Sequence, residues 1–236
     1  ELMDTADDTS GWTRAHIESA ISGIAEIHSI WYGREDELLG QPWLGEVPDT
    51  AGMKEKTRLW EMLAVHAVEE FPEWFDERDS KIFRAAVYSL DKWYPELDAM
   101  PKTLTHNDFN PRNIAFRRVA GQLQLCAYDW ELATVQVPQH DLAELLTFTL
   151  DETADLRQIN HYVEFHRQAL QRATGTDIDP EQWRRGYQLS LRDLLINRVP
   201  LYLMAHTFRH YKFMDRVQRS LRRLLQLEAQ RVRENA

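Results

Sequence analysis

The sequence predicts a mainly α-helical α+β fold in which short β-strands surround a few polar loops. Apolar residues recur at spacings of three and four through most of the 236-residue chain, as on one face of a helix. Between Lys102 and Ala133 this pattern gives way to short segments rich in aliphatic, aromatic and β-branched residues, which are typical of strands. The sequence has no internal repeat and no low-complexity linker, so we expect one helical domain over residues 11–236.

Helical spacing predicts three helices in the N-terminal part, over residues 12–31, about 54–71 and about 83–97. The first carries isoleucines on one face and should therefore pack against the core. Residues 33–52 are dense in Gly and Pro, which predicts loops and short turns. Pro95 and Pro101 are expected to interrupt the third helix, because proline cannot donate a helical hydrogen bond.

After the strand-rich segment, the helical pattern resumes at Pro138 and continues to the end of the chain. Asp179 and Pro180 supply an N-cap and a first helical proline, and Gln182 is placed to close a capping box. Pro200 should kink or split the helix in which it lies. Residues 216–233 alternate leucines with arginines, which predicts an amphipathic helix with a solvated basic face.

The composition indicates a globular protein with neither a membrane-spanning nor an export segment. No run of about 18 apolar residues exists, and the N-terminus lacks the basic and apolar parts of a signal peptide. The single cysteine, Cys126, suits a reducing compartment, so we expect a cytoplasmic protein. The formal net charge of −10 disfavours nucleic acid or an anionic membrane as a partner and would suit a cationic substrate.

Carboxylate and amide side chains cluster in the strand-rich segment. Asp108 and Asn113 are five residues apart on a loop, and Asp129 ends the next apolar strand. Phosphoryl transfer needs a carboxylate to orient the attacking hydroxyl and hard oxygen ligands to hold magnesium on the phosphates. These three residues provide that set, so their spacing predicts a metal and nucleotide site.

Four ordered elements define this region: His-x-Asp-x-x-x-x-Asn from His106, a strand, Tyr128-Asp129-Trp130-Glu131, and a proline-containing loop before Asp141-Leu142-Ala143. Together they resemble the catalytic core of the aminoglycoside phosphotransferases and of the choline and ethanolamine kinases. The resemblance reaches back to the start of the chain, where LMDTADDTSGW and the helix that follows are similar to the family's interlobe hinge and first large-lobe helix.

The resemblance implies the large C-terminal lobe of a protein-kinase-like fold, with its catalytic loop within residues 104–133. Residues 1–10 would be the hinge from an N-terminal lobe that carries the phosphate-covering loop and its lysine. We expect that lobe to lie outside this sequence, so the chain alone should not turn over. The intact protein would be a Mg²⁺-dependent kinase for a small-molecule hydroxyl, with ATP or GTP as the donor.

The resemblance also implies residue roles. Asp108 would be the catalytic base or hydroxyl-orienting group. Asn113 and Asp129 would bind the Mg²⁺ that holds the nucleotide phosphates. His106 and Asp141 would brace the catalytic loop from behind.

Two further side chains leave alternatives open. Arg112 could reach a phosphate or a neighbouring carboxylate. Glu131 could position the metal through water or cap the strand, and we favour the structural role. Many family members have Gly where this chain has Asn107 and His-Pro where it has Asn110-Pro111, and the His-Asn-Asp opening is closer to the choline and ethanolamine kinases.

The acceptor predicted in this way is an aminoglycoside, a choline-like or ethanolamine-like amine, or another small metabolite. The competing hypothesis is a catalytically inactive kinase-like binding or regulatory module. A metal-dependent hydrolase is disfavoured by the neutral Asn113 in the predicted metal site.

Overall fold

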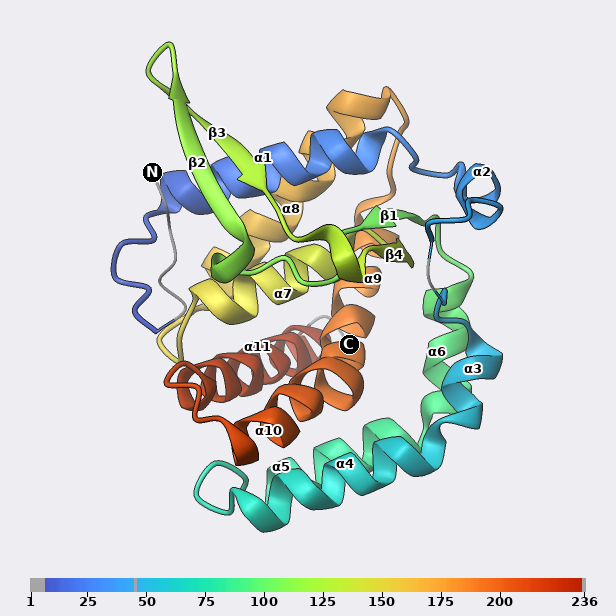
Figure 1. The fold of residues 1–236 in the computed structure, drawn as a ribbon, viewed down its shortest axis with the longest axis vertical. Coiled ribbons are helices and arrows are strands. Elements are labelled where there is room, and N and C mark those ends of the chain that lie inside the picture. The colour runs from blue at the N-terminus through green and yellow to red at the C-terminus, as the bar shows by residue number, and fades with distance from the viewer. Residues whose placement is uncertain (1–6, 45, 235–236) are drawn as a thin grey trace.

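The computed structural model describes residues 7–44 and 46–234, and this part of the chain is mainly helical with a few short strands, as the sequence predicts (Figure 1). The helices are α1 (Arg14–Ser29), α2 (Glu35–Leu39), α3 (Thr50–Glu55), α4 (Thr57–Glu70), α5 (Glu77–Tyr88), α6 (Leu90–Asp98), α7 (Gln139–Thr149), α8 (Leu156–Thr174), α9 (Pro180–Asp193), α10 (Val199–Phe208) and α11 (Met214–Glu234). Of the expected hinge at residues 1–10, residues 1–6 lie outside the described part.

Four strands form two small antiparallel pairs. Strand β1 (Thr103–Thr105) pairs with β4 (Thr134–Gln136), and β2 (Ile114–Val119) pairs with β3 (Gln122–Ala127). The chain therefore leaves β1, makes the β2–β3 hairpin and returns to β4 beside its starting point. This return brings the loop before β2 and the loop after β3 together on one side of the molecule (Figure 1).

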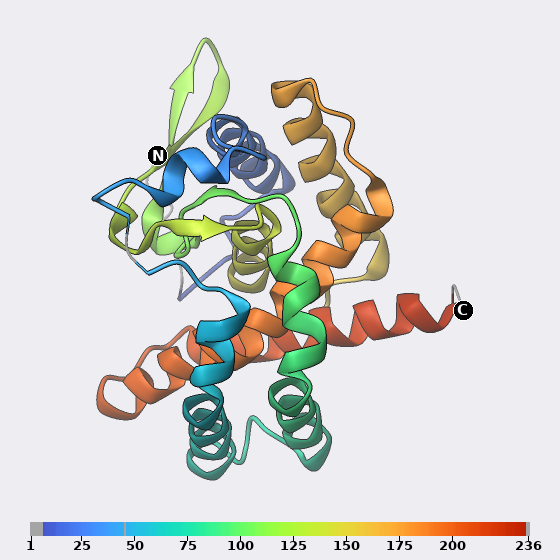
Figure 2. The same ribbon diagram turned by 90° about the vertical axis from the view of Figure 1, so that its right-hand side faces the viewer.

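Helix α7 is the centre of the core. Every residue from Gln139 to Thr149 is buried, because α9 and α11 pack against it and the loop between β1 and β2 covers its first turn. Helix α1 packs on α8 and against β3. Helices α4 and α5 form a hairpin at the far end of the molecule from the β2–β3 hairpin (Figures 1 and 2).

The predicted helix boundaries are partly wrong. The helix expected over 54–71 is two helices that break at Lys56, and the one expected over 83–97 breaks at Ser89. Pro95 lies inside α6 and does not end it. Burial of Trp93, Tyr94 and Leu97 around the proline holds this short helix together through tertiary packing. Strand β4, which has only three residues, was not predicted.

The C-terminal predictions are closer to the structure. Asp179 accepts a hydrogen bond from the backbone N–H of Gln182 at 2.6 Å, and Pro180 opens α9. Among the described residues, only this half of the capping box forms. Pro200 lies in the first turn of α10, directly after a π-helical segment, η3 (Leu194–Arg198), that separates α10 from α9.

Helix α11 is amphipathic as predicted. Val217, Leu221 and Leu224 are buried, and Arg219 is exposed. The predicted basic face is only partly solvated, because Arg216 and Arg223 are half-buried and donate to backbone carbonyls. Within the described ranges, no helix combines the length and the apolar character that crossing a membrane requires.

Candidate functional site

The loop that follows β1 is fixed from below by Asp141, in the first turn of α7. The backbone N–H groups of His106 and Asn107 donate to its two carboxylate oxygens at 2.8 and 2.9 Å. Nε2 of His28, at the end of α1, bonds to the same carboxylate at 2.9 Å. Three elements that are distant in sequence therefore meet at one buried carboxylate.

Asp141 is charged in spite of its burial. Burial alone would raise the pKa of its carboxyl, but the hydrogen bond and electrostatic attraction of His28 outweigh it, with further help from His106 and His140, and the pKa falls to about 2. Burial lowers the pKa of the neighbouring His140. The loop is thus anchored to a carboxylate that stays ionised at neutral pH.

Asn107 has a left-handed backbone, with φ of 59°. Apart from Gly, Asn is one of the few residues that adopts this conformation readily. Its side chain donates to the carbonyl of Leu132 at 3.0 Å, which joins the catalytic loop to the loop before β4. The left-handed turn therefore favours Asn or Gly at this position.

Asp108 follows this turn, and its side chain is 14% exposed. Four donors meet its Oδ1: Arg198 at 2.5 Å, Asn110 at 2.6 Å, Tyr202 at 2.7 Å and Arg112 at 3.4 Å. Burial raises the pKa of Asp108, but the charge of Arg198 and the Tyr202 hydrogen bond outweigh it, so the pKa lies below its ordinary value. Asp108 is therefore an ionised carboxylate that can accept a hydroxyl proton.

Asn113 and Asp129 lie together at the base of the β2–β3 hairpin. Asn113 ends the 3-10 turn η1 (Pro111–Asn113), and its carbonyl accepts the N–H of Tyr128, the residue before Asp129. The amide nitrogen of Asn113 donates to Oδ2 of Asp108 at 2.8 Å and to its carbonyl at 2.9 Å. Asp129 is exposed and has a left-handed backbone with φ of 64°.

These two side chains suit a magnesium ion. Because Asn113 uses its amide nitrogen toward Asp108, its amide oxygen is left for a cation, and no described residue bonds to that oxygen. Asp129 adds an exposed carboxylate at the same edge. An amide oxygen and a carboxylate oxygen are hard ligands, and Mg²⁺ usually takes one or two protein ligands and completes its shell with water and phosphate oxygens.

His106 links the two loops of the site. Its Nε2 contacts the carbonyl of Tyr128 at 2.8 Å, and its ring lies 4.5 Å from that of Trp130, centroid to centroid. Trp130 opens the 3-10 turn η2 (Trp130–Leu132), where Glu131 is exposed. His106 therefore lies behind the loop, while Glu131 lies at its surface.

Arg112 contacts a neighbouring carboxylate, which is one of the two partners expected for it. Its guanidinium is 3.4 Å from Asp108, donates to the hydroxyl of Tyr202 at 2.5 Å and lies over the rings of Tyr202 and Phe213. These contacts hold it at the C-terminal helices.

Three residues of the site were not identified from the sequence: Glu144, Arg198 and Tyr202. Glu144 is fully buried one turn after Asp141, and burial raises its pKa to about 7 against the opposing effect of Arg198. Asn110 donates to both Glu144 and Asp108, at 3.2 and 2.6 Å. The spacing of Asp141 and Glu144 on one helix was a usable signal, but no local motif marks Arg198 or Tyr202.

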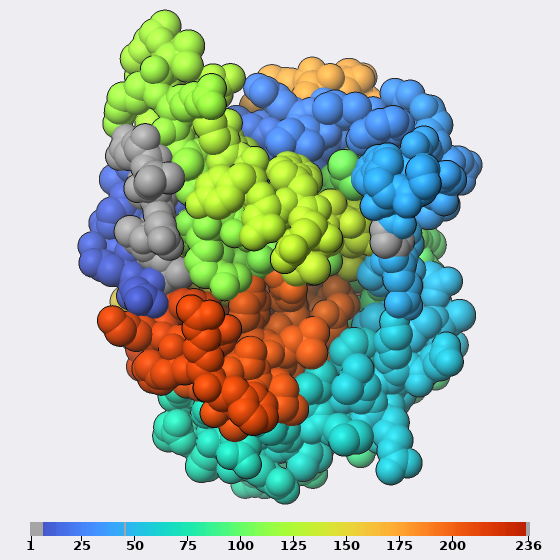
Figure 3. Space-filling view, viewed as in Figure 1, coloured from blue at the N-terminus to red at the C-terminus, as the bar shows by residue number. Residues whose placement is uncertain are grey.

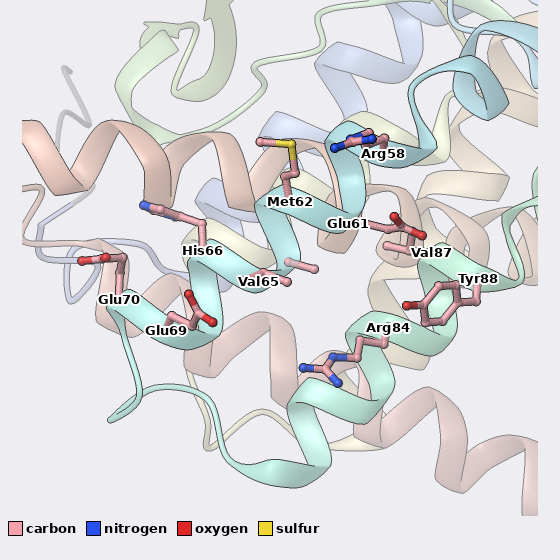
Figure 4. Close-up of a pocket in the computed structure, with 11 residues that line it drawn as sticks. Arg58, Glu61, Met62, Val65, His66, Glu69, Glu70, Arg84, Val87 and Tyr88 are labelled. Carbon is pink, nitrogen blue, oxygen red and sulfur yellow. The ribbon is translucent and has the colours of Figure 1, made fainter.

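A hollow of about 220 Å³ adjoins the catalytic loop. Its lining includes Asn107, Gln136, Asn197, Arg198, Trp60 and Lys56. In the space-filling view, the surface of the segment before β4 borders that of α10 on this face (Figure 3). A larger hollow of about 700 Å³ is lined by residues of α4 and α5, among them Val65 and Tyr88, and the described residues that line it include none from the loop that carries Asp108 (Figure 4).

Comparison with known proteins agrees with this geometry. Residues 7–176 match the phosphotransferase enzyme family. The choline kinase of Cryptosporidium parvum Iowa II aligns with a TM-score of 0.59 and 13% identity, over 96% of this chain and 69% of that chain. A Ralstonia eutropha JMP134 protein, provisionally assigned as an aminoglycoside phosphotransferase, aligns with a TM-score of 0.56 and 14% identity, over 97% and 69%. No curated protein sequence matches. Because the matched segment spans most of the chain, the chain belongs to the phosphotransferase enzyme family and has the fold of the aminoglycoside phosphotransferases and choline kinases.

Proposed function

We propose that this chain carries the catalytic loop of an ATP- and Mg²⁺-dependent kinase that phosphorylates a hydroxyl group of a small molecule. The observation that carries the proposal is the ionised Asp108, hydrogen-bonded to Asn113. The carbonyl of Asn113 accepts the N–H of Tyr128, the residue before Asp129, and the adjacent Asn107 lines an open hollow. Family membership supports phosphotransfer to a small molecule.

In the proposed reaction, Asp108 accepts a hydrogen bond from the acceptor hydroxyl and orients its oxygen toward the γ-phosphorus of ATP. A new oxygen–phosphorus bond forms, the bond from the γ-phosphorus to the bridging oxygen breaks, and ADP leaves. The hydroxyl proton passes to Asp108 and then to solvent. Such transfers need little covalent chemistry from the protein, so orientation is the main contribution of Asp108.

Asn113 and Asp129 would hold Mg²⁺, which would neutralise charge on the phosphate oxygens. His106 and Asp141 would fix the loop from behind through the backbone contacts described above. We further propose that an N-terminal lobe completes the nucleotide site and that the protein acts in the cytoplasm.

Two observations bear on the acceptor. The net charge of −10 and the structural similarity to a choline kinase support a cationic amino alcohol as the acceptor. The charges that line the hollow beside the loop are paired, Lys56 with Glu46 and Arg198 with Asp108, which supports a neutral hydroxyl compound instead. A panel of acceptors decides between them.

The test is nucleotide consumption by the full-length gene product with amino alcohols, aminoglycosides and sugars, in the wild type and in Asp108→Asn. We expect kcat of the variant to fall about 10²- to 10⁴-fold, which is the usual contribution of a positioned acid or base to the rate. Asp177→Asn, an exposed carboxylate away from the loop, is the matched control and should keep full activity. An active Asp108→Asn enzyme would refute the proposal. Absence of both turnover and Mg-ATP binding would favour the inactive binding module.

A further inference from the structure

Two residues near the start of α10 contact Asp108, although they lie far from it in the sequence. Arg198 directly precedes this helix, and Tyr202 lies within it. Tyr202 donates to Oδ1 of Asp108 at 2.7 Å, although the two residues are 94 positions apart. Arg198, one turn earlier, reaches the same oxygen at 2.5 Å. Both residues lie beyond the segment that matches the family, which ends at residue 176.

Pro200 explains why these side chains point to the loop. Proline has no N–H, and its ring collides with the carbonyl four residues earlier in an ideal α-helix. The chain avoids this by widening into the π-helical segment η3, where the N–H of Val199 bonds to the carbonyl of Leu194, five residues earlier. Arg198 and Tyr202 then follow each other at a spacing of four and share one face.

The hydrogen-bond direction at Tyr202 is fixed by its neighbours. Its hydroxyl is 2.5 Å from a guanidinium nitrogen of Arg112 and 3.4 Å from one of Arg198. Arginine can only donate, so the hydroxyl accepts from these groups and gives its own proton to Asp108. The Tyr202 ring is held in turn by Phe148 and Phe213, with ring centroids 5.7 and 6.2 Å away.

The two oxygens of Asp108 are used unequally. Oδ1 meets Arg198, Tyr202, Asn110 and Arg112, whereas among the described residues Oδ2 accepts only from Asn113. An ionised carboxylate offers about two acceptor positions on each oxygen. Oδ1 is therefore saturated, and Oδ2 keeps room for one more donor.

We propose that Tyr202 and Arg198 are positioning residues that hold Oδ1 of Asp108, so that Oδ2 receives the hydrogen of the acceptor hydroxyl. The proposal rests on the proposed catalytic role of Asp108. Neither residue needs to touch the reacting atoms, because each acts by fixing the rotation of the carboxylate. A misaligned carboxylate would still allow nucleotide and acceptor to bind but would slow transfer.

The first test is a mutant cycle in the full-length gene product. Tyr202→Phe removes only the hydroxyl, and we expect kcat to fall about 10- to 100-fold, the worth of a hydrogen bond to a charged group, with little change in either KM. In an Asp108→Asn background the same change should have almost no effect, because the group it positions is gone. Equal losses in both backgrounds would overturn the proposal.

Two further comparisons separate positioning from general damage. Arg198→Lys should retain more of kcat than Arg198→Gln, since it keeps a cation near Oδ1. Tyr88→Phe, which changes a tyrosine that is 68% exposed on α5, is the matched control and should leave kcat unchanged. Melting temperatures of all variants show whether a loss reflects unfolding.

A structural readout keeps this inference separate from the proposed function. Should the wild type turn over no acceptor, the kinase assignment fails, but the orientation of Asp108 can still be measured. In a crystal structure of the Tyr202→Phe/Arg198→Gln variant, we expect the Asp108 carboxylate to rotate away from its wild-type position. An unchanged carboxylate in that variant would overturn the positioning role.

Discussion

Asp141 and His28 form a hydrogen-bonded pair at 2.9 Å in which both side chains are completely buried. The pair joins the start of α7 to the end of α1, 113 residues apart. Because the same carboxylate also accepts two backbone N–H groups of the catalytic loop, it serves as the common acceptor for three donors. An ionised carboxylate can satisfy all three, whereas an amide would turn a donor toward at least one of them.

The first prediction follows from this contact. Asp141→Asn should lower the free energy of unfolding at pH 7 by about 1–3 kcal/mol, the usual cost of leaving a buried hydrogen-bond donor without its acceptor. Urea denaturation measures the change. Asp177→Asn, at an exposed position, should differ from the wild type by less than about 0.5 kcal/mol. If Asp141→Asn changed the free energy of unfolding as little as this control does, the Asp141 carboxylate would not hold the loop.

Acid titration should show the same contact. The pKa of Asp141 is lowered from 3.8 to about 2, so its ionisation stabilises the fold above pH 4 and this contribution is lost as pH falls from about 4 toward 2. The expected loss is about 2 kcal/mol. Urea unfolding at a series of acidic pH values should show this loss in the wild type and not in Asp141→Asn. If the free energy of unfolding fell equally with pH in both proteins, the lowered pKa could not belong to Asp141.

Glu144 should behave in the opposite way. Burial raises its pKa from 4.5 to about 7, so the folded state prefers the protonated form and stability decreases as pH rises through this range. Glu144→Gln is neutral at every pH. Relative to the wild type, this variant should therefore gain on the order of 3 kcal/mol between pH 5 and pH 8.

Urea unfolding at both pH values measures this difference, and Glu70→Gln, at an exposed position of α4, is its control. The control should keep the same difference from the wild type at both pH values. If the stability difference between Glu144→Gln and the wild type were also the same at both pH values, Glu144 would stay ionised beside Arg198.

Local spacing predicts which residues share the centre of the candidate site. Asp108 and Asn113 share the short loop before β2, and Asp129 follows β3, which pairs with β2 in a hairpin. One loop and one hairpin therefore determine where these three residues lie. Arg198 and Tyr202 depend instead on where α10 packs. Helical periodicity indicates which face of a helix is buried, but not which distant loop that face meets.

The positions at which helices break also depend on packing that the sequence does not reveal. Pro95 was expected to end a helix, yet packing of the surrounding aromatic and aliphatic side chains keeps α6 intact, and the break occurs at Ser89. Pro200 did separate two helices, because the wider η3 segment that precedes it is compatible with the packing there. A proline removes one hydrogen bond in either case, and the tertiary contacts decide the outcome.

Asn107 allows a test of backbone strain in the catalytic loop. With φ of 59°, the position accepts Gly easily, whereas a β-branched residue would be strained by about 1–3 kcal/mol. We expect Asn107→Gly to lose only the side-chain bonds to Leu132 and His140 and to remain active. Asn107→Val should be less stable than Asn107→Gly in thermal denaturation. The reverse order would show that the left-handed backbone does not disfavour a β-branched residue at this position.

Gly23, in the middle of α1, distinguishes helix propensity from packing. Propensity alone predicts that Gly23→Ala stabilises the protein by about 1 kcal/mol. However, a Cβ atom at this position would lie 2.4 Å from Cβ of Leu125 in β3, so α1 and the hairpin would have to separate. We therefore expect a net loss of about 1–3 kcal/mol in the free energy of unfolding, the usual effect of overpacking.

The matched control for this change is Gly40→Ala. Gly40 has φ of −91°, and no atom lies within 4 Å of the added Cβ, so this substitution should be neutral or slightly stabilising. Urea denaturation of the two variants should thus give shifts of opposite sign or clearly different size. Because the displaced hairpin carries the proposed magnesium ligands Asn113 and Asp129 at its base, Gly23→Ala should also weaken Mg-ATP binding. Unchanged binding in a destabilised variant would show that α1 does not position these two residues.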